Sequence, residues 1–154
     1  RTFTREDGKK TPGWWLKVEL PSGRVMSYPG IGISIEKSIE DDDYDEKATY
    51  RERIRFMGMS QTTRQWGKRY TYGGSLAENV TQALCRDLLA AALVRVEEAG
   101  WPIVLHVHDE CVCEVPDSPE YSAKELERLM CILPEWAGEF PLAAEGQELK
   151  RYAK

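Results

Sequence analysis

Residues 105–113, Leu-His-Val-His-Asp-Glu-Cys-Val-Cys, form the stretch around which the fold of this chain is expected to be organised. A short polar band of two histidines and two carboxylates lies between apolar runs at 103–107 and 111–115. The β-branched and apolar residues of both runs favour paired strands. The sequence therefore predicts a β-hairpin with Asp109 and Glu110 at its turn. Because hairpin turns favour Asn-Gly or Asp-Gly, we interpret this pair as retained for its side chains.

The composition is that of one mixed domain. A chain of 154 residues with 42% hydrophobic content can bury a core, and we expect a single α+β domain spanning residues 1–154. The net charge of −5 gives no general preference for nucleic acid, so any such contact must come from a local patch. Four cysteines are too few for a disulfide framework at this length. With neither a signal peptide nor a membrane-spanning run, the sequence predicts a cytoplasmic protein with reduced thiols and no membrane partner.

The N-terminal part reads as a series of strands. Residues 1–13 are polar and contain Gly and Pro, which predicts a flexible lead-in, and the initial Arg is a weak indication of an excised piece. Strands are expected at 14–20 and 25–28, joined by a Pro-Ser-Gly turn. The alternation of isoleucines at 31–35 predicts a short half-buried strand. The acidic run at 40–46 (EDDDYDE) is expected to be a solvated loop, with a metal site or a basic partner as the less favoured alternative.

A basic stretch follows the acidic run. Residues 50–59 alternate so that Arg51, Arg53 and Arg55 share one face of a predicted strand, opposite Ile54 and Phe56. The segment from 47 to 69 contains seven basic residues and one acidic residue. This excess fits the electrostatic footprint of a phosphate backbone. A solvent-facing sheet neutralised by the acidic run explains the same pattern, and both interpretations stay open.

A long helix is predicted next. Residues 75–78, Ser-Leu-Ala-Glu, have the spacing of a capping box, and the apolar pattern ends at about Glu98, before Gly100. Apolar residues cover more than half of its circumference, so we expect it to be mostly buried. A polar stripe of Glu78 or Asn79, Gln82 and Arg86 lies on one face. Such a stripe needs a partner, which is either another protein segment or a bound ligand.

The C-terminal third predicts one more helix and one more strand. Ser118 is expected to cap a helix that Pro134 stops. Residues 140–145 are expected to form a last short strand, followed by a basic tail.

Two carboxylates at the tip of a hairpin are a pattern that holds divalent magnesium. Hard oxygen ligands bind Mg²⁺ and leave coordination positions for water and substrate phosphates. Because adjacent strand residues point in opposite directions, we expect Asp109 rather than Glu110 to be the main ligand. A two-metal site needs at least one further carboxylate from elsewhere.

A zinc site is the less favoured alternative. If Asp109 and Glu110 form the turn, His108 pairs with Cys111 and His106 pairs with Cys113. These four side chains share one sheet face, as a Cys₂His₂ site requires. No other part of the sequence supports a zinc module.

Three ordered motifs resemble one enzyme family. Residues 72–83 (YGGSLAENVTQA), 86–89 (RDLL) and 104–110 (VLHVHDE) are similar to the C-terminal palm region of family A DNA polymerases, the DNA polymerase I family, in its phage or prophage branch. Residues 20–24 and 144–152 extend the resemblance over nearly the whole chain. It implies an antiparallel palm-type sheet with a central His-Asp-Glu hairpin packed on a long helix.

The resemblance also implies roles for individual residues. Asp109 would bind the catalytic Mg²⁺ ions, Glu110 would assist, and His108 would lie near the primer terminus. Gln82 would reach the minor groove of the new base pairs, whose acceptors are present in every sequence, and Arg86 follows as its neighbour. The implied partners are primer-template DNA, deoxynucleoside triphosphates and the remainder of the polymerase chain.

Two departures from the family pattern limit what this chain can do alone. The family's first catalytic Asp motif and its nucleotide-binding helix are absent. The pattern Arg64-x-x-x-Lys68-x-x-x-Tyr72 imitates that helix, but it lies directly before the Gln82 helix, so we interpret it as accidental. We therefore expect a fragment of a DNA-directed DNA polymerase with a two-metal mechanism, inactive in isolation. The alternative is a non-catalytic α+β module that binds nucleic acid or protein.

Overall fold

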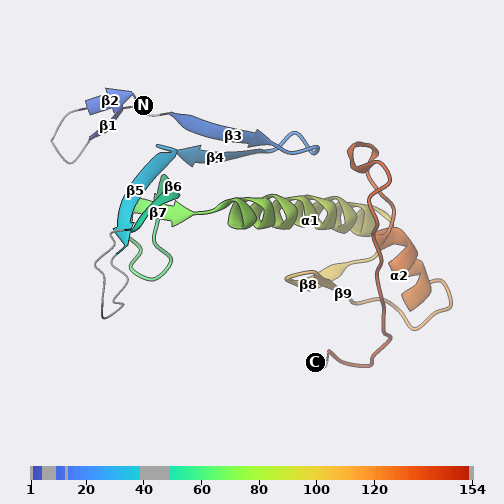
Figure 1. The fold of residues 1–154 in the computed structure, drawn as a ribbon. Helices are drawn as coiled ribbons and strands as arrows, with labels where there is room; N and C mark the ends of the chain where they lie inside the picture. Colours follow the sequence, from blue (N-terminus) through green and yellow to red (C-terminus); the bar gives the residue numbers. More distant parts are fainter. Residues whose placement is uncertain (1, 5–9, 13, 39–48, 153–154) are drawn as a thin grey trace. The chain divides into compact units, whose positions relative to one another are not determined.

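Antiparallel strand pairs and two α-helices make up the described chain, which confirms the predicted α+β class. The computed structural model describes residues 2–4, 10–12, 14–38 and 49–152 (Figure 1). The chain divides into two compact units, Arg1–Val80 and Thr81–Lys154. Each unit is described by itself below.

The first unit begins with two antiparallel ribbons. β1 (Thr2–Thr4) pairs with β2 (Lys10–Pro12) inside the segment expected to be a lead-in. β3 (Trp15–Glu19) pairs with β4 (Val25–Pro29), which confirms the two strands predicted there. Between them the chain reverses at Gly23, whose φ of +81° is a conformation that glycine adopts without steric cost.

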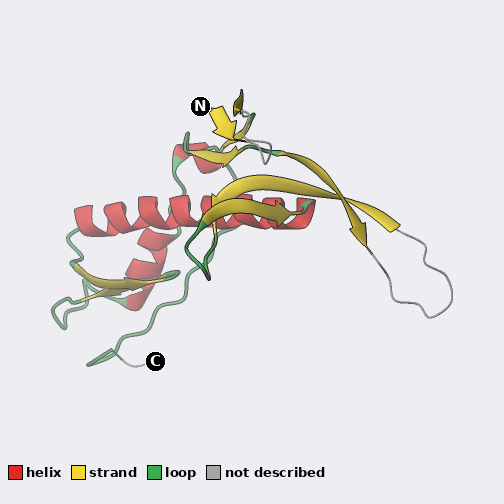
Figure 2. Ribbon diagram, turned by 90° about the vertical axis from the view of Figure 1, so that its left-hand side faces the viewer, coloured by secondary structure: helices red, strands yellow, loops and turns green. Residues whose placement is uncertain are grey.

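A three-stranded sheet completes the first unit, in the order β5 (Gly32–Ser38), β6 (Thr49–Met59) and β7 (Trp66–Thr71). Its strands are the long curved arrows in Figure 2. The predicted strand around the isoleucines is confirmed, but its half-burial is wrong. Ile33 and Ile35 are 65% and 68% exposed, because the described chain does not cover their face of β5. The acidic run at 40–46 lies outside the described residues.

Helix α1 (Gly73–Glu98) confirms the predicted long helix and its C-terminal end. The capping box is wrong, because the Leu76 N–H already bonds the Tyr72 carbonyl at 3.1 Å and the helix begins before Ser75. At the other end, Gly100 has a φ of +83°, the left-handed conformation that commonly ends helices.

A smaller part of the α1 surface is buried than the sequence predicted. Its buried residues, Leu88, Ala92 and Val96, repeat every four positions and form one stripe of the C-terminal half. Val94, on a different face, is 59% exposed. The prediction of a mostly buried helix is therefore wrong, because the apolar surface outside this stripe meets little of the described chain.

The second unit packs a hairpin and a short helix on the C-terminal half of α1. The hairpin consists of β8 (Ile103–Val107) and β9 (Glu110–Cys113), and forms a sheet of its own among the described residues. Val96 of α1 forms the centre of the core with Trp101 and Leu129, and Ile103, Cys113 and Val115 pack against this cluster. The hairpin is therefore fixed to the helix at the hairpin's open end.

Helix α2 (Ala123–Met130) begins four residues after the position predicted from Ser118. Its N-cap is Ser122, whose hydroxyl accepts a hydrogen bond from the Glu125 N–H at 3.3 Å. Ser118 instead stabilises the preceding turn, where its carbonyl accepts from the Tyr121 N–H. The capping signature in the sequence is therefore Ser122-x-x-Glu125 and not the pair Ser118-Pro119.

The C-terminal segment follows α2 without a further strand. A short 3₁₀ helix (Glu135–Ala137) comes first, and the strand predicted at 140–145 is wrong. The segment is tied to α2 by carboxylates, since Glu127 accepts from the Gly146 N–H and Glu148 accepts from the Ala123 N–H, each at 2.8 Å. No helix in the described part of the chain is long and apolar enough to cross a membrane.

Candidate functional site

The hairpin turn lies one residue earlier than the sequence predicted. Val107 pairs with Glu110, so the two turn residues are His108 and Asp109, and Glu110 is the first residue of β9. His108 has a φ of +54°, whereas Asp109 does not have a positive φ. A positive φ at the first central position alone is the pattern of a type II′ turn, which favours Gly at that position. The misfit expected at Asp-Glu is therefore present, but at His108.

The three residues predicted at the hairpin tip are all exposed: His108, Asp109 and Glu110. Glu110 and Cys111 follow each other on β9, so their side chains point to opposite faces. Cys111 contacts Met130 of α2, with 3.6 Å between the two sulfur atoms. Glu110 therefore lies on the face directed away from that contact. The tip offers two carboxylates to solvent, from a turn whose base is packed into the core.

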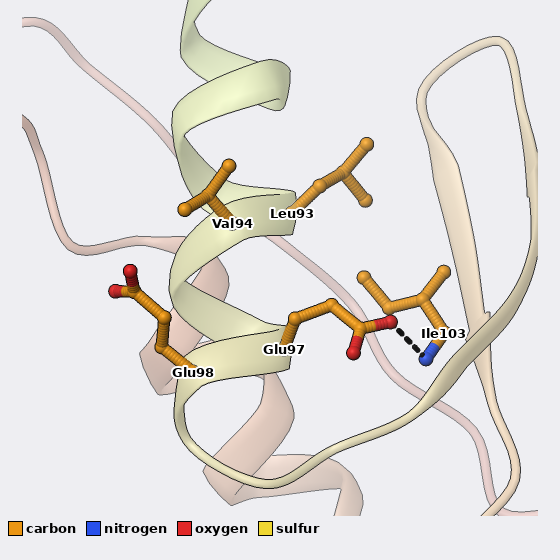
Figure 3. Close-up of a pocket in the computed structure, with 5 residues that line it drawn as sticks. All are labelled: Leu93, Val94, Glu97, Glu98 and Ile103. Carbon is orange, nitrogen blue, oxygen red and sulfur yellow. Dashed lines mark hydrogen bonds between the residues drawn. The ribbon is translucent and has the colours of Figure 1, made fainter.

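One hydrogen bond fixes the start of β8 against α1. The Ile103 N–H donates to the Glu97 Oε1 at 2.7 Å. Figure 3 shows Leu93 and Glu97 on the side of α1 that faces β8, and Val94 and Glu98 on the far side. These residues line an open, mostly apolar pocket of about 400 Å³. Figures 1 and 2 both show the hairpin running back from this point along the C-terminal half of α1.

The length of β8 sets how far the hairpin reaches from the Glu97 contact. β8 spans four residue steps, from Ile103 to Val107, and a strand rises about 3.3 Å per residue, so it extends about 13 Å. His108 and Asp109 then form the turn at its end. The same length corresponds to about nine residues of α-helix, so a hairpin that returned parallel to the helix axis would bring its tip towards the Gln82–Arg86 part of α1.

Gln82 and Arg86 also lie on the correct face of α1. At 100° per residue, Gln82, Arg86, Leu93 and Glu97 fall within an arc of about 60°. Because Leu93 and Glu97 face β8, Gln82 and Arg86 continue that face towards the N-terminal end of the helix. Both side chains are exposed. Gln82, Arg86 and Asp109 are thus three exposed polar side chains of the second unit.

Asn79, the first residue of the predicted polar stripe, has a protein partner. Its side-chain amide donates to the Tyr28 hydroxyl at 3.3 Å, and Tyr28 is buried with its ring edge-on to Phe56. Asn79 therefore joins α1 to β4 within the first unit. The sequence left open whether the polar stripe contacts another protein segment or a bound ligand. For Asn79, the partner is a protein segment.

The zinc alternative is wrong because its register is not formed. His106 pairs with Cys111, and Cys113 pairs with Ile103, so His108 lies in the turn and not opposite a cysteine. Burial, with a smaller contribution from the neighbouring Cys111, raises the pKa of the Cys113 thiol to about 12. Burial also raises the pKa of Cys111.

The oxygen ligands at the tip fit magnesium as part of a site. Within the described residues, no group of three or more His, Cys, Asp and Glu side chains could hold a metal ion. Magnesium does not require such a cage, because it is commonly bound by one or two carboxylates together with substrate phosphates and water. The exposed Asp109 carboxylate is a donor of this kind. Completing the site would require oxygen donors from beyond the described residues.

Glu97 is the site residue that sequence reasoning missed. It contributes no chemistry at the tip, yet its carboxylate accepts the hydrogen bond that sets where β8 begins along the helix. The available signal was positional, since Glu97 stands in the last turn of α1, where a carboxylate opposes the helix dipole. An acid in that place is more readily explained by a local N–H donor than by solvation alone.

The comparisons with known proteins agree with a polymerase-related chain. The chain is similar to a protein named DNA polymerase from Bacillus phage SP02, with 36% identity over 142 residues. The match covers 90% of this chain and 20% of the relative, so the chain spans about one fifth of that protein's length. Neither a protein-family model nor a solved structure matches the chain.

Proposed function

We propose that this chain is the C-terminal palm portion of a family A DNA polymerase of the phage or prophage branch. The observation that carries the proposal is that the hairpin is anchored on α1 through Glu97, while Asp109 at its tip and Gln82 and Arg86 on the helix are all exposed. The similarity to a phage DNA polymerase over 90% of the chain supports the same conclusion. The complete enzyme would extend a primer by attack of its 3′-hydroxyl on a deoxynucleoside triphosphate.

Each candidate residue has a role that follows from its place. Gln82 is an exposed neutral amide that can donate to the minor-groove acceptors common to all base pairs. Arg86, one turn further along α1, can bind a phosphate of the same duplex. His108 and Asp109 project from the tip beside them, where the primer end would lie. Glu110 is the second carboxylate of the tip and assists Asp109.

Asp109 would hold Mg²⁺ in the intact enzyme, with Glu110 nearby. When bound, the metal would activate the attacking hydroxyl and stabilise charge on the phosphates. The chain itself positions the carboxylate, through a hairpin whose base is fixed by the Glu97 hydrogen bond and by the core. The remaining metal ligands and the triphosphate site would belong to the rest of the polymerase.

Primer-template binding by the 154-residue chain tests the DNA-contact face. Gln82→Ala and Arg86→Ala should each weaken binding. Arg86→Ala should also lower the slope of log K against log salt by about one, the value for one phosphate contact. Lys124→Ala removes an exposed positive charge from α2 and serves as the control, with binding unchanged. Equal losses in all three variants would contradict a specific face.

DNA synthesis by the longer polymerase chain tests the catalytic role. Asp109→Ala should abolish nucleotide incorporation while primer-template binding is retained. Asp117→Ala removes an equally exposed carboxylate from the loop after the hairpin, and incorporation should continue at the normal rate. Retained incorporation in Asp109→Ala would favour the alternative of a non-catalytic binding module.

A further inference from the structure

One face of the sheet β5-β6-β7 gathers positive charge. In the observed register, Arg51, Arg53 and Arg55 of β6 share this face with Lys68 of β7, because Met57 pairs with Lys68 and Arg55 pairs with Tyr70. Successive arginines on one face are about 7 Å apart along the strand. In register, Glu36 of β5 is the one acidic position on this face among the described residues. We call this surface the arginine face.

Small residues on β5 leave the arginine face open. Gly32 pairs with Arg55, and Ser34 pairs with Arg53. A side chain at Gly32 would meet the Arg55 guanidinium, whose atoms lie 3.7 to 3.9 Å from the position of a Cβ. The guanidinium of Arg55 therefore lies over the glycine backbone. Long side chains from the central strand extend across a floor formed by their small neighbours.

Aromatic rings lie among the cations on the same face. Tyr70 and Trp66 of β7 share the face with Lys68, since the three residues alternate along one strand. Trp66 is 58% exposed and Tyr70 is 41% exposed. The Arg53 guanidinium lies over the Tyr70 ring, 4.9 Å from its centroid. This cation–π contact orients the planar guanidinium, whose edges carry the N–H donors that match phosphate oxygens.

The opposite face of the sheet differs in character. It carries the apolar Ile33, Ile35, Ile54 and Phe56. Arg69 lies on this opposite face, opposite Phe56 and one residue from Lys68 in sequence. The arginines are therefore concentrated on one side of the sheet by the strand alternation. General solubility would not require that concentration.

We propose that the arginine face binds single-stranded nucleic acid, with the arginines and Lys68 on the phosphates and Trp66 stacking on a base. Positive charge along the backbone path combined with exposed aromatic rings is the combination that binds single strands without sequence preference. A pocket of about 380 Å³ beside Arg53 and Tyr70 extends to Tyr72 and Gly73 and gives room for a neighbouring base or sugar. Its lining also includes Glu52, Ile54 and Thr71 of the opposite face. This surface belongs to the first unit, whereas the hairpin tip belongs to the second.

Fluorescence anisotropy of a labelled twenty-residue oligothymidine with the 154-residue chain tests this proposal. Lys68→Ala should weaken binding several-fold and lower the slope of log K against log salt by about 0.7, the value for one phosphate contact on a single strand. Trp66→Ala should weaken binding by about 5- to 150-fold with the salt slope unchanged, because stacking is not an ionic contact. Trp66→Phe should recover part of that loss.

Arg69→Ala is the matched control, since it removes the same charge from the neighbouring residue on the opposite face. Its affinity should stay within twofold of the parent chain. An equal loss in Arg69→Ala and Lys68→Ala would overturn the proposal, because net charge alone would then explain the binding.

A second arm of the experiment separates nucleic acid from acidic protein partners. Unlabelled polyglutamate should compete weakly with the oligothymidine at equal charge, and competition as strong as that of unlabelled oligothymidine would also overturn the proposal. The polymerase assignment is tested by nucleotide incorporation with Asp109→Ala, whereas this proposal is tested by oligothymidine binding with Lys68→Ala and Trp66→Ala. Failure here is therefore distinguishable from failure of the polymerase assignment.

Discussion

Glycine and alanine substitutions at the two turn residues test the hairpin geometry. His108 has a φ of +54°, and an L-residue in the left-handed region costs about 1–2 kcal/mol. Glycine removes this strain but adds about 0.5–1 kcal/mol of backbone entropy cost. Since His108→Gly and His108→Ala both lose the imidazole, we expect the glycine variant to be more stable by about 0.5–1 kcal/mol.

The adjacent position should show the opposite order. Asp109 does not have a positive φ, so glycine there brings the entropy cost without any relief of strain. Asp109→Ala should therefore exceed Asp109→Gly in stability by about 0.5–1 kcal/mol. The assay is urea unfolding of the 154-residue chain followed by circular dichroism, with equal denaturant slopes required for the comparison. If alanine is the more stable residue at both positions, the turn is not formed by His108 and Asp109.

The result also bears on why histidine occupies this position. A side chain kept in a conformation that favours glycine indicates that its imidazole is used, since the surrounding fold must offset the strain. In the longer polymerase chain, we expect His108→Gly to reduce incorporation even though the hairpin becomes more stable. A more stable variant with full activity would contradict that interpretation.

Two further predictions concern the core of the second unit. Val96→Ala should lower the unfolding free energy by about 2 kcal/mol, because it removes two methyl groups from a fully buried site. Val94→Ala, at a site that is 59% exposed, should change the unfolding free energy by less than about 0.5 kcal/mol. Urea unfolding measures both values. Iodoacetamide at pH 8 should label the exposed Cys85 well before Cys113, whose pKa of about 12 leaves about one thiolate in 10,000. Labelling of Cys113 should rise about tenfold per pH unit up to that pKa, as peptide mass spectrometry can follow, and equal labelling at pH 8 would show that its burial is wrong.

Local sequence patterns were sufficient to predict most of the helices and strands. Period-two alternation located β3, β4 and β6, and the register confirmed that Arg51, Arg53 and Arg55 share one face. The end of α1 followed from Gly100 and Pro102, whose conformational preferences depend little on the rest of the fold. Such signals act over a few residues, so they survive without knowledge of tertiary contacts.

Turns and caps were less predictable because several nearby residues compete for each role. The observed hairpin turn lies one residue earlier than predicted, because the Asp-Glu pair and the His-Asp pair both fit a two-residue turn poorly. Which pair forms the turn depends on how β8 and β9 pack on the core. At α2, Ser118 and Ser122 are both good caps. Tertiary hydrogen bonds to Ala123 and Gly146 favour the later start.

Burial was the property that sequence predicted least well. The apolar residues of α1 and the isoleucines of β5 indicated buried faces, yet Val94, Ile33 and Ile35 are more than half exposed. Periodicity reports which residues are apolar, whereas burial depends on which surfaces meet them. For the site, the residues at the tip and on α1 could be named from sequence, but the anchoring of the hairpin by the Glu97 contact with β8 could not.

Photo-crosslinking from position 109 measures most directly whether the hairpin tip stands beside the Gln82–Arg86 part of α1. With p-benzoylphenylalanine in place of Asp109, irradiation of the 154-residue chain followed by trypsin digestion should join the tip to the peptide Tyr70–Arg86. The same photoreactive residue at Asp117 should give no such product. Crosslinks from position 109 that reach only the α2 and C-terminal peptide, Leu129–Lys150, would place the carboxylate away from the DNA-contact face and contradict the account.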